Sequence, residues 1–177
     1  AETEVKEARD RVRAALVQSG FEFPARKVTV NLAPADLPKE SGRFDLAIAL
    51  GLLAASGQLP AGGLEAYEFA GELALTGALR PIRGALAMRH SARHCGRTFI
   101  LPVESAREAA YAGSEGVLGA AGLLDVCAHL LGQTPLRCPE PVPSRGLKAP
   151  PDLADIRGQA SARRAWKSPP QAATRCS

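Results

Sequence analysis

The stretch KVTVNLAPADLPKESGRFDLAIALGLLAA, residues 27–55, carries most of the information on the fold that we expect for this chain. Its first seven residues, 27–33, alternate polar and apolar side chains, which predicts a β-strand with one face formed by Val28, Val30 and Leu32. A loop over residues 34–44 follows. Asp45 then begins an almost wholly apolar helix that ends before Ser56-Gly57. Because so apolar a helix must be covered on most sides, we expect it in the middle of the domain.

Hydrophobic patterns on both sides of this stretch predict a mixed α/β domain with a single core. Residues 2–19 have the pattern of an amphipathic helix, which Gly20 terminates. Residues 67–82 predict two strands around a turn at 75–78, where Gly77 accommodates a positive φ. The remaining expected elements are helices at 84–94, 104–112 and 123–131 and short strands at 98–102 and 117–118. The core is expected to end near Leu131.

The charge of this 177-residue chain is concentrated towards its C-terminal end. Of its 22 Lys and Arg and its 18 Asp and Glu, 15 of each group lie in residues 1–138, so the formal net charge of +4 arises in residues 139–177. A neutral body argues against a broad nucleic-acid-binding surface, because neutralising phosphates requires clustered Lys and Arg.

The sequence gives no indication of a membrane or an oxidising compartment. Apolar runs stay short of the roughly 18–20 residues that a membrane helix needs, and the acidic first residues are unlike a secretory signal. We therefore expect a cytoplasmic protein with no membrane partner. The four cysteines are expected to be unpaired thiols, because none has CxxC spacing: Cys95, Cys127, Cys138 and Cys176.

The composition changes after residue 133. Six prolines make residues 134–151 an expected extended linker, and residues 152–165 lead into a new helical pattern that stops at Trp166. Trp166 requires the codon TGG, and Lys167 requires AAA or AAG. Read one base earlier, these bases encode Leu, Met or Val followed by Glu, which continues the helix. We therefore expect residues 166–177 to be out of frame, which sequencing of the locus would test.

Three segments of the chain closely resemble the N-terminal domain of magnesium-chelatase-related AAA+ proteins, a family that includes the competence protein ComM. They are residues 28–40 (VTVNLAPADLPKE), 43–46 (RFDL) and 71–77 (GELALTG), and the likeness covers residues 2–165. The resemblance implies that residues 1–133 form a Lon-like domain, with the mixed-sheet Lon proteolytic-domain-like (ribosomal protein S5 domain 2-like) fold. It also implies that opening strands are missing before Ala1, and that residues 152–165 begin a truncated AAA+ module.

Lon-type peptidases use a Ser/Lys dyad, and the resemblance places other residues at both positions. Alignment on Pro38-Lys39-Glu40 and on residues 47–50 puts Asp45 at the Ser position, and alignment on residues 81–84 puts Leu86 at the Lys position. A dyad needs a hydroxyl nucleophile and an amine that accepts its proton, and a carboxylate and an isobutyl group supply neither. The implied domain is therefore a pseudo-protease with no catalytic residues. Asp45 is expected instead to cap the helix that it begins.

Other candidate groups have weaker support. In a shifted alignment Ser41 and Lys39 would supply a hydroxyl and an amine, which leaves an active peptidase as an alternative. Cys127 continues an apolar stripe and is expected to be buried, although His129 lies close in sequence. Lys167-Ser168 is not preceded by the GxxxxG of a phosphate-binding loop, so no nucleotide site is expected in this chain.

His90 and His94 raise the possibility of a metal site. They lie four residues apart, on one helix face, and Cys95 follows them. However, no further ligand has recognisable spacing, and three arginines crowd the segment: Arg89, Arg93 and Arg97. We therefore favour a solvated helix face, and expect no metal and no cofactor in this chain.

The resemblance implies an accessory domain of an AAA+ ATPase. The intact parent would use ATP and Mg²⁺ and form a homo-oligomeric ring. It would act as an ATP-driven motor that carries out branch migration of DNA during natural transformation. Contacts between subunits are favoured for this domain, and the candidate DNA contacts are a groove of Arg43, Arg80 and Arg83 and the basic tail residues Arg157, Arg163, Arg164, Lys167 and Arg175. The alternatives are a Lon-type Ser/Lys peptidase and a subunit of a metal-chelatase assembly, the latter weakened by an aromatic content of only 5%.

Overall fold

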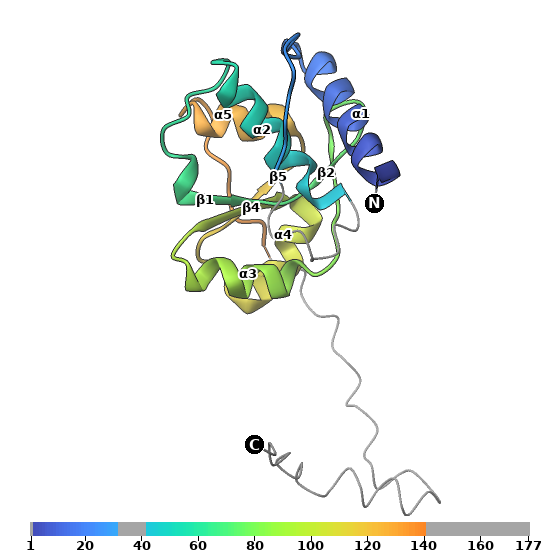
Figure 1. The fold of residues 1–177 in the computed structure, drawn as a ribbon. Coiled ribbons are helices and arrows are strands. Elements are labelled where there is room, and N and C mark those ends of the chain that lie inside the picture. Colours follow the sequence, from blue (N-terminus) through green and yellow to red (C-terminus); the bar gives the residue numbers. More distant parts are fainter. Residues whose placement is uncertain (1, 32–41, 141–177) are drawn as a thin grey trace, which may run out of the picture. The chain divides into compact units, whose positions relative to one another are not determined.

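The computed structural model describes residues 2–31 and 42–140, and a short parallel β-sheet lies at its centre (Figure 1). The sheet has the order β1-β4-β5 and consists of β1 (Tyr67–Phe69), β4 (Thr98–Pro102) and β5 (Val117–Ala120). The central strand β4 runs parallel to both neighbours, with Phe99 opposite Glu68 of β1 and Val117 of β5. A parallel sheet connected through helices confirms the expected α/β class.

Helices cover both faces of this sheet. One face carries α1 (Glu2–Gln18), α2 (Asp45–Ala55) and α5 (Leu123–Leu130), and the other carries α3 (Ala85–His94) and α4 (Val103–Ala109). Short 3-10 helices precede α2 and β1 and follow α4: η1 (Gly42–Phe44), η2 (Leu64–Ala66) and η3 (Ala110–Ala112). The alternation of side chains along β4 divides the core, because Ile100 packs with the first group of helices, whereas Phe99 and Leu101 pack with the second.

The central position expected for the apolar helix is confirmed for one of its faces, whereas Gly51 and Ala55 are exposed on the other. Four residues of α2 are buried in the cluster that also contains residues of α1 and α5: Leu46, Ala49, Leu50 and Leu53. From α1, the residues Val12, Ala15 and Leu16 enter the same cluster. The other expected helices, and the strands at 98–102 and 117–118, are also present, with ends that differ by a few residues.

The strand expected at residues 27–33 is wrong over its described part, 27–31. Val28 and Val30 are 37% and 48% exposed, so they do not form a buried face. An alternating sequence forms a strand only where a neighbouring strand satisfies its backbone groups, and none of the described strands pairs with this segment. Leu32 and Ala33 lie outside the described residues.

The two strands expected within residues 67–82 are divided between two sheets. β1 joins the parallel sheet, whereas β2 (Glu72–Leu73) and β3 (Leu79–Arg80) form an antiparallel ribbon around Gly77, whose φ is +86°. Gly71 explains the break between β1 and β2. Its N–H donates to the carbonyl of Arg43 at 2.9 Å, and its carbonyl accepts from the N–H of Leu46 at 3.1 Å. The chain at Gly71 therefore bonds to the start of α2 rather than to a strand.

Packing continues beyond α5 into the first residues of the expected linker 134–151. The N–H of Gly119 donates to the carbonyl of Arg137 at 3.0 Å, and Leu136 packs against the cluster beneath α2. Residues 141–177, which hold the rest of the linker, the expected AAA+ lead-in and the basic tail, lie outside the described part of the chain. No helix among the described residues combines the length and apolar character needed to cross a bilayer.

The Asp125 side chain stabilises the start of α5, and substitution of this residue tests how much it contributes to the stability of the fold. Its Oδ2 accepts hydrogen bonds from the N–H groups of Ala121 and Gly122, both at 3.0 Å. We expect Asp125→Ala to lower the free energy of unfolding by about 1 kcal/mol, because two N–H groups at a helix start lose their acceptor. Urea denaturation would measure this loss. Asp125→Asn retains an oxygen acceptor and should lose less, so equal losses for the two variants would contradict this assignment.

Candidate functional site

Asp45, the residue at the aligned nucleophile position, begins α2 with only 1% of its surface exposed. Its Oδ2 accepts a hydrogen bond from Arg11 Nε at 2.8 Å and its Oδ1 accepts one from Arg11 Nη2 at 3.3 Å. The N–H of Leu73 also donates to Oδ2, at 3.3 Å. One carboxylate therefore connects α1, α2 and β2. The expected hydrogen-bonded helix cap is wrong, because this carboxylate binds Arg11 and the Leu73 N–H instead, although Asp45 does place an acid in the first turn of α2.

Burial and hydrogen bonding act in opposite directions on this carboxyl group. Desolvation raises the pKa of Asp45 above its usual range, although the Arg11 guanidinium and the Leu73 N–H both lower it. The hydrogen bond to Asp45 in turn raises the pKa of Arg11. The Arg11 side chain is 24% exposed, so the cation reaches water and the carboxylate does not. The largest loss of folding free energy is therefore expected when the buried carboxylate of Asp45 loses its cation.

Gly42 leaves the space in which these charges meet. A Cβ at this position would lie 2.6 Å from Glu72 Cγ, 2.7 Å from Asp45 Oδ2 and 3.0 Å from Arg11 Nη2. Glu72 also pairs with Arg80, whose Nη1 lies 3.6 Å from its Oε1. We call these five residues, Arg11, Gly42, Asp45, Glu72 and Arg80, the Asp45 cluster. Its charged groups pair with one another around a glycine that has no room for a side chain.

Leu86, the second aligned dyad position, is in a different environment. It lies in the first turn of α3 with 45% of its surface exposed, and its neighbour Ala85 packs in the cluster on the far side of the sheet from α2. The partner that Asp45 does have, Arg11, keeps its proton and cannot act as a base. Ser41 and Lys39, the alternative hydroxyl and amine, lie outside the described residues.

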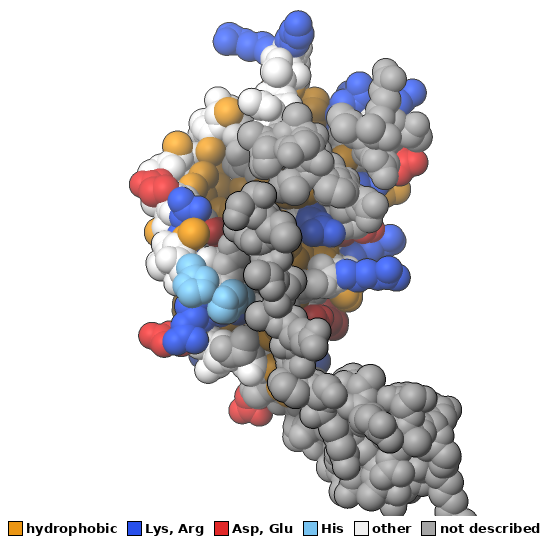
Figure 2. All heavy atoms as spheres, turned by 60° about the horizontal axis from the view of Figure 1, so that its bottom comes forward, with side chains coloured by type: hydrophobic (Ala, Val, Ile, Leu, Met, Phe, Trp, Pro, Cys, Tyr) orange, Lys and Arg blue, Asp and Glu red, His pale blue; other side chains and the backbone are white. Residues whose placement is uncertain are grey.

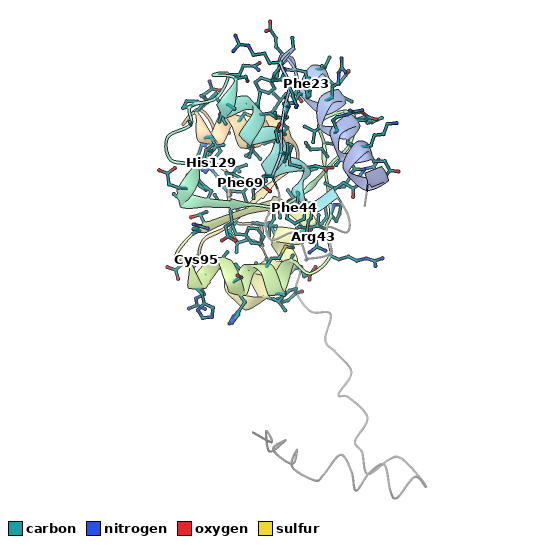
Figure 3. All side chains as sticks on the ribbon, in the orientation of Figure 1. Phe23, Arg43, Phe44, Phe69, Cys95 and His129 are labelled. Carbon is teal, nitrogen blue, oxygen red and sulfur yellow. The ribbon has the colours of Figure 1, made fainter. Side chains whose placement is uncertain are left out.

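Two of the three arginines expected to form a DNA-binding groove lie on elements that border β2. Arg43 belongs to η1, at the start of α2 (Figure 3), and its carbonyl binds the N–H of Gly71 immediately before β2. Arg80 lies opposite Glu72 in the β2–β3 ribbon. Arg83 is exposed, in the turn before α3. Because Glu72 pairs with Arg80, this part of the surface is less positive than its arginines alone imply.

The candidate metal residues are brought together only in part. His90 Nε2 and His94 Nε2 lie 3.0 Å apart on α3, and Cys95 is an exposed free thiol at the end of that helix (Figure 3). Within the described part of the chain, no group of three His, Cys, Asp or Glu residues could hold a metal ion. The expected solvated face is wrong for Arg89, which is 4% exposed and donates to the carbonyl of Glu115.

Cys127 and His129 have structural roles. Cys127 is buried in the core, as expected, and burial raises the pKa of its thiol to about 11. His129 Nδ1 accepts a hydrogen bond from the N–H of Leu136 at 3.2 Å, and its ring packs edge-on against Tyr67 with 5.7 Å between centroids. Lys167, Ser168 and the basic tail residues lie outside the described part of the chain.

Arg11 is the site residue that the sequence analysis missed. It lies at the edge of the apolar stripe of α1, between Ala8 and Ala15, where the pattern predicts a solvent-exposed arginine. The available signal was Asp45 itself, because a single carboxylate at the start of an almost wholly apolar helix requires a partner. That signal indicates a need for a cation, but does not identify which of the chain's arginines supplies it.

Known proteins match this chain along most of its length. Residues 1–105 match the protein family described as subunit ChlI of Mg-chelatase. The chain is 53% identical over 163 residues to the protein YifB of Salmonella typhimurium, 50% identical over 163 residues to YifB of Escherichia coli, and 46% identical over 169 residues to the competence protein ComM of Haemophilus influenzae.

These alignments cover 92%, 92% and 93% of the chain but 32%, 32% and 33% of the relatives' own lengths. The chain therefore spans about a third of the length of the curated relatives that it matches. The family match begins at residue 1 and includes the whole of η1, α2 and the β2–β3 ribbon, and so contains the complete Asp45 cluster. The chain belongs to the magnesium-chelatase-related family defined by subunit ChlI of Mg-chelatase.

Proposed function

We propose that residues 1–133 are a non-catalytic, Lon-like accessory domain of a magnesium-chelatase-related AAA+ ATPase. The observation that carries this proposal is the environment of Asp45, which is 1% exposed and bonded through both carboxylate oxygens. A nucleophile must meet its substrate carbonyl and must pass a proton to a base. A buried carboxylate paired with a guanidinium meets neither requirement.

The Lon-like, ribosomal protein S5 domain 2-like fold remains part of this proposal. Its support is the sequence resemblance over residues 28–40, 43–46 and 71–77. The parallel β1-β4-β5 sheet with helices on both faces is compatible with an α/β domain of this kind.

For the intact parent we propose an ATP-driven motor on DNA that uses ATP and Mg²⁺ and assembles as a homo-oligomeric ring in the cytoplasm. The relative from Haemophilus influenzae is named a competence protein, and the relatives are about three times as long as this chain. A longer parent leaves room for the nucleotide-binding module that this chain is expected to lack. Within that parent, the pairing of Arg80 with Glu72 favours a role for this domain in subunit contacts over direct phosphate binding.

A second candidate is a subunit of a metal-chelatase assembly, for which the family description as subunit ChlI of Mg-chelatase is the supporting observation. The two candidates differ in what should stimulate ATP hydrolysis. A DNA motor should respond to branched DNA, whereas a chelatase subunit should respond to its partner subunits and a porphyrin.

The test uses the intact parent, with the reading frame continued beyond residue 165. We expect branched DNA to raise its ATPase rate at least about tenfold, the scale of a 1.4 kcal/mol change in barrier. The triple variant Arg43→Ala, Arg80→Ala, Arg83→Ala should change this stimulation less than about twofold if the domain serves subunit contacts. Loss of DNA affinity in the triple variant would instead assign DNA binding to this domain. An ATPase indifferent to DNA would overturn the motor proposal.

A separate measurement addresses the peptidase alternative. The 177-residue chain, incubated with unfolded casein, should release no peptides above the rate of buffer alone, because no dyad is expected. Ser41→Ala serves as the control, since it removes the remaining hydroxyl proposed as a nucleophile. Cleavage by the chain that disappears in Ser41→Ala would refute a non-catalytic domain.

A further inference from the structure

His90 and His94 present two imidazole nitrogens at the surface of α3, away from the Asp45 cluster. Their Nε2 atoms lie 3.0 Å apart, their ring centroids lie 4.5 Å apart, and the ring planes cross at 88°. Both side chains are exposed, and Figure 2 shows pale-blue imidazoles next to one another on the surface. The pair is therefore accessible to a solute.

The two distances fit nitrogens that share one metal ion. Imidazole nitrogens bind divalent transition-metal ions at about 2.0–2.1 Å. Two nitrogens whose bonds to the ion form an angle of about 90° therefore lie about 2.9 Å apart, and their ring centroids lie about 4.5 Å apart. Tetrahedral positions would place the nitrogens about 3.4 Å apart. The observed 3.0 Å and 4.5 Å match the square-planar or octahedral case.

The two Nε2 atoms also lie within hydrogen-bond distance of one another, so one ring can donate its N–H to the other. A straight N–H···N bond, with each ring axis directed at the other nitrogen, would separate the centroids by about 5.3 Å at this nitrogen separation. The observed 4.5 Å is shorter, so the two ring axes are bent away from a straight line. A bound ion would replace this hydrogen bond with two nitrogen–metal bonds.

The neighbouring positive charges are partly compensated. Arg97 Nη1 lies 3.4 Å from Glu68 Oε1, and the guanidinium of Arg89 is buried and bound to the carbonyl of Glu115. Arg93 remains as an exposed cation on the same helix and should weaken the binding of a divalent ion without blocking it. Among the described residues no third ligand joins the pair, so water would fill the other positions.

We propose that His90 and His94 form an exposed two-imidazole site for a divalent late transition-metal ion. Imidazole suits Cu²⁺, Ni²⁺ and Zn²⁺, and the general order of affinity places Cu²⁺ first. Square-planar or tetragonal geometry, which the 3.0 Å separation of the nitrogens fits, is also the preference of Cu²⁺ and Ni²⁺. With only two protein ligands and water at the rest, the ion exchanges readily with solvent.

Titration of the untagged chain with Ni²⁺, followed by isothermal calorimetry, tests the site. We expect one ion per chain, and a loss of affinity of about 100-fold in His90→Gln or His94→Gln, because losing either ligand removes the chelate. Both side chains are exposed, so the variants should fold, and their unchanged melting temperature without metal would verify this. The Tm of the unsubstituted chain should rise with Ni²⁺, and that of the variants should not.

Cys95→Ser is the matched control, because it alters the exposed thiol next to His94 and leaves both imidazoles. Its Ni²⁺ affinity should stay within about twofold of the original, in contrast to the loss expected for either histidine. The electron paramagnetic resonance spectrum of the Cu²⁺ complex should show coupling to two nitrogens. Equal Ni²⁺ binding by the chain and by the double variant His90→Gln, His94→Gln, or loss of binding in Cys95→Ser, would overturn the proposal.

Discussion

Arg11→Met is expected to lower the free energy of unfolding at neutral pH by about 3–5 kcal/mol, the range for removing one partner of a buried ion pair. The loss arises because Asp45, 1% exposed, would have no cation and only the N–H of Leu73 still bonded to it, so that either a bare buried charge or its protonation costs free energy. Methionine retains much of the apolar stem of arginine, so packing along α1 is largely preserved. Urea denaturation of both proteins at pH 7 measures the difference.

The same variant should show a characteristic dependence on pH. Without Arg11, desolvation is opposed by fewer groups, so the folded-state pKa of Asp45 rises further above the unfolded value of about 3.9. A carboxyl with a raised folded pKa contributes stability that is complete below the unfolded pKa and is lost as pH rises through the folded pKa. The deficit of Arg11→Met relative to the unsubstituted chain should therefore be smallest near pH 4 and largest at pH 7.

Two controls separate this effect from a general weakening of α1. Arg9→Met alters an exposed arginine on the same helix, whose partner Asp10 is also exposed, and should change stability by less than about 0.5 kcal/mol. The double variant Arg11→Met, Asp45→Leu removes both charges and should recover much of the loss. A deficit that is the same at every pH would show that the lost ion pair is not its cause.

Gly42→Ala is expected to have the second largest effect, a loss of about 2–3 kcal/mol. The new Cβ would approach Glu72 Cγ to 2.6 Å and Asp45 Oδ2 to 2.7 Å, so the Asp45 cluster must spread, which strains a close-packed site. The melting temperature and the urea midpoint of the variant measure this loss.

Gly51→Ala is the matched control, because it makes the same change inside α2 where a Cβ meets nothing within 4 Å. There the substitution should stabilise the chain by about 0.5–1 kcal/mol, since alanine favours helix more than glycine does. The two glycine substitutions should therefore act in opposite directions. A stabilising or neutral Gly42→Ala would contradict the crowding that the geometry indicates.

Local patterns in the sequence predicted the elements that bury their own side chains. The helix beginning at Asp45 and the strand at 98–102 were both placed from apolar runs, and both lie in the core. The α/β class followed from the order of such elements. Each of these features depends on a periodicity within a few consecutive residues.

The features that sequence analysis could not supply depend on residues far apart in the chain. Residues 27–31 alternate as a strand does, but whether they form one depends on a neighbour elsewhere in the fold. The break between β1 and β2 at Gly71 arises from hydrogen bonds to Arg43 and Leu46, which lie at the start of α2 and precede Gly71 in the sequence by nearly the whole of that helix and the loop after it. Similarly, Arg11 and Asp45 are 34 residues apart, and no local periodicity connects them.

The bridge between Gly119 and Arg137 has a mechanical consequence. The residues after α5 return to the outer edge of β5. They are held by the backbone hydrogen bond between Gly119 and Arg137, the hydrogen bond from the Leu136 N–H to His129 Nδ1 and the packing of Leu136 and Pro139. In relatives about three times as long, tension from the C-terminal side would act first on this short attachment. Because this attachment lies outside the β1-β4-β5 hydrogen bonds, it can yield while the sheet stays intact.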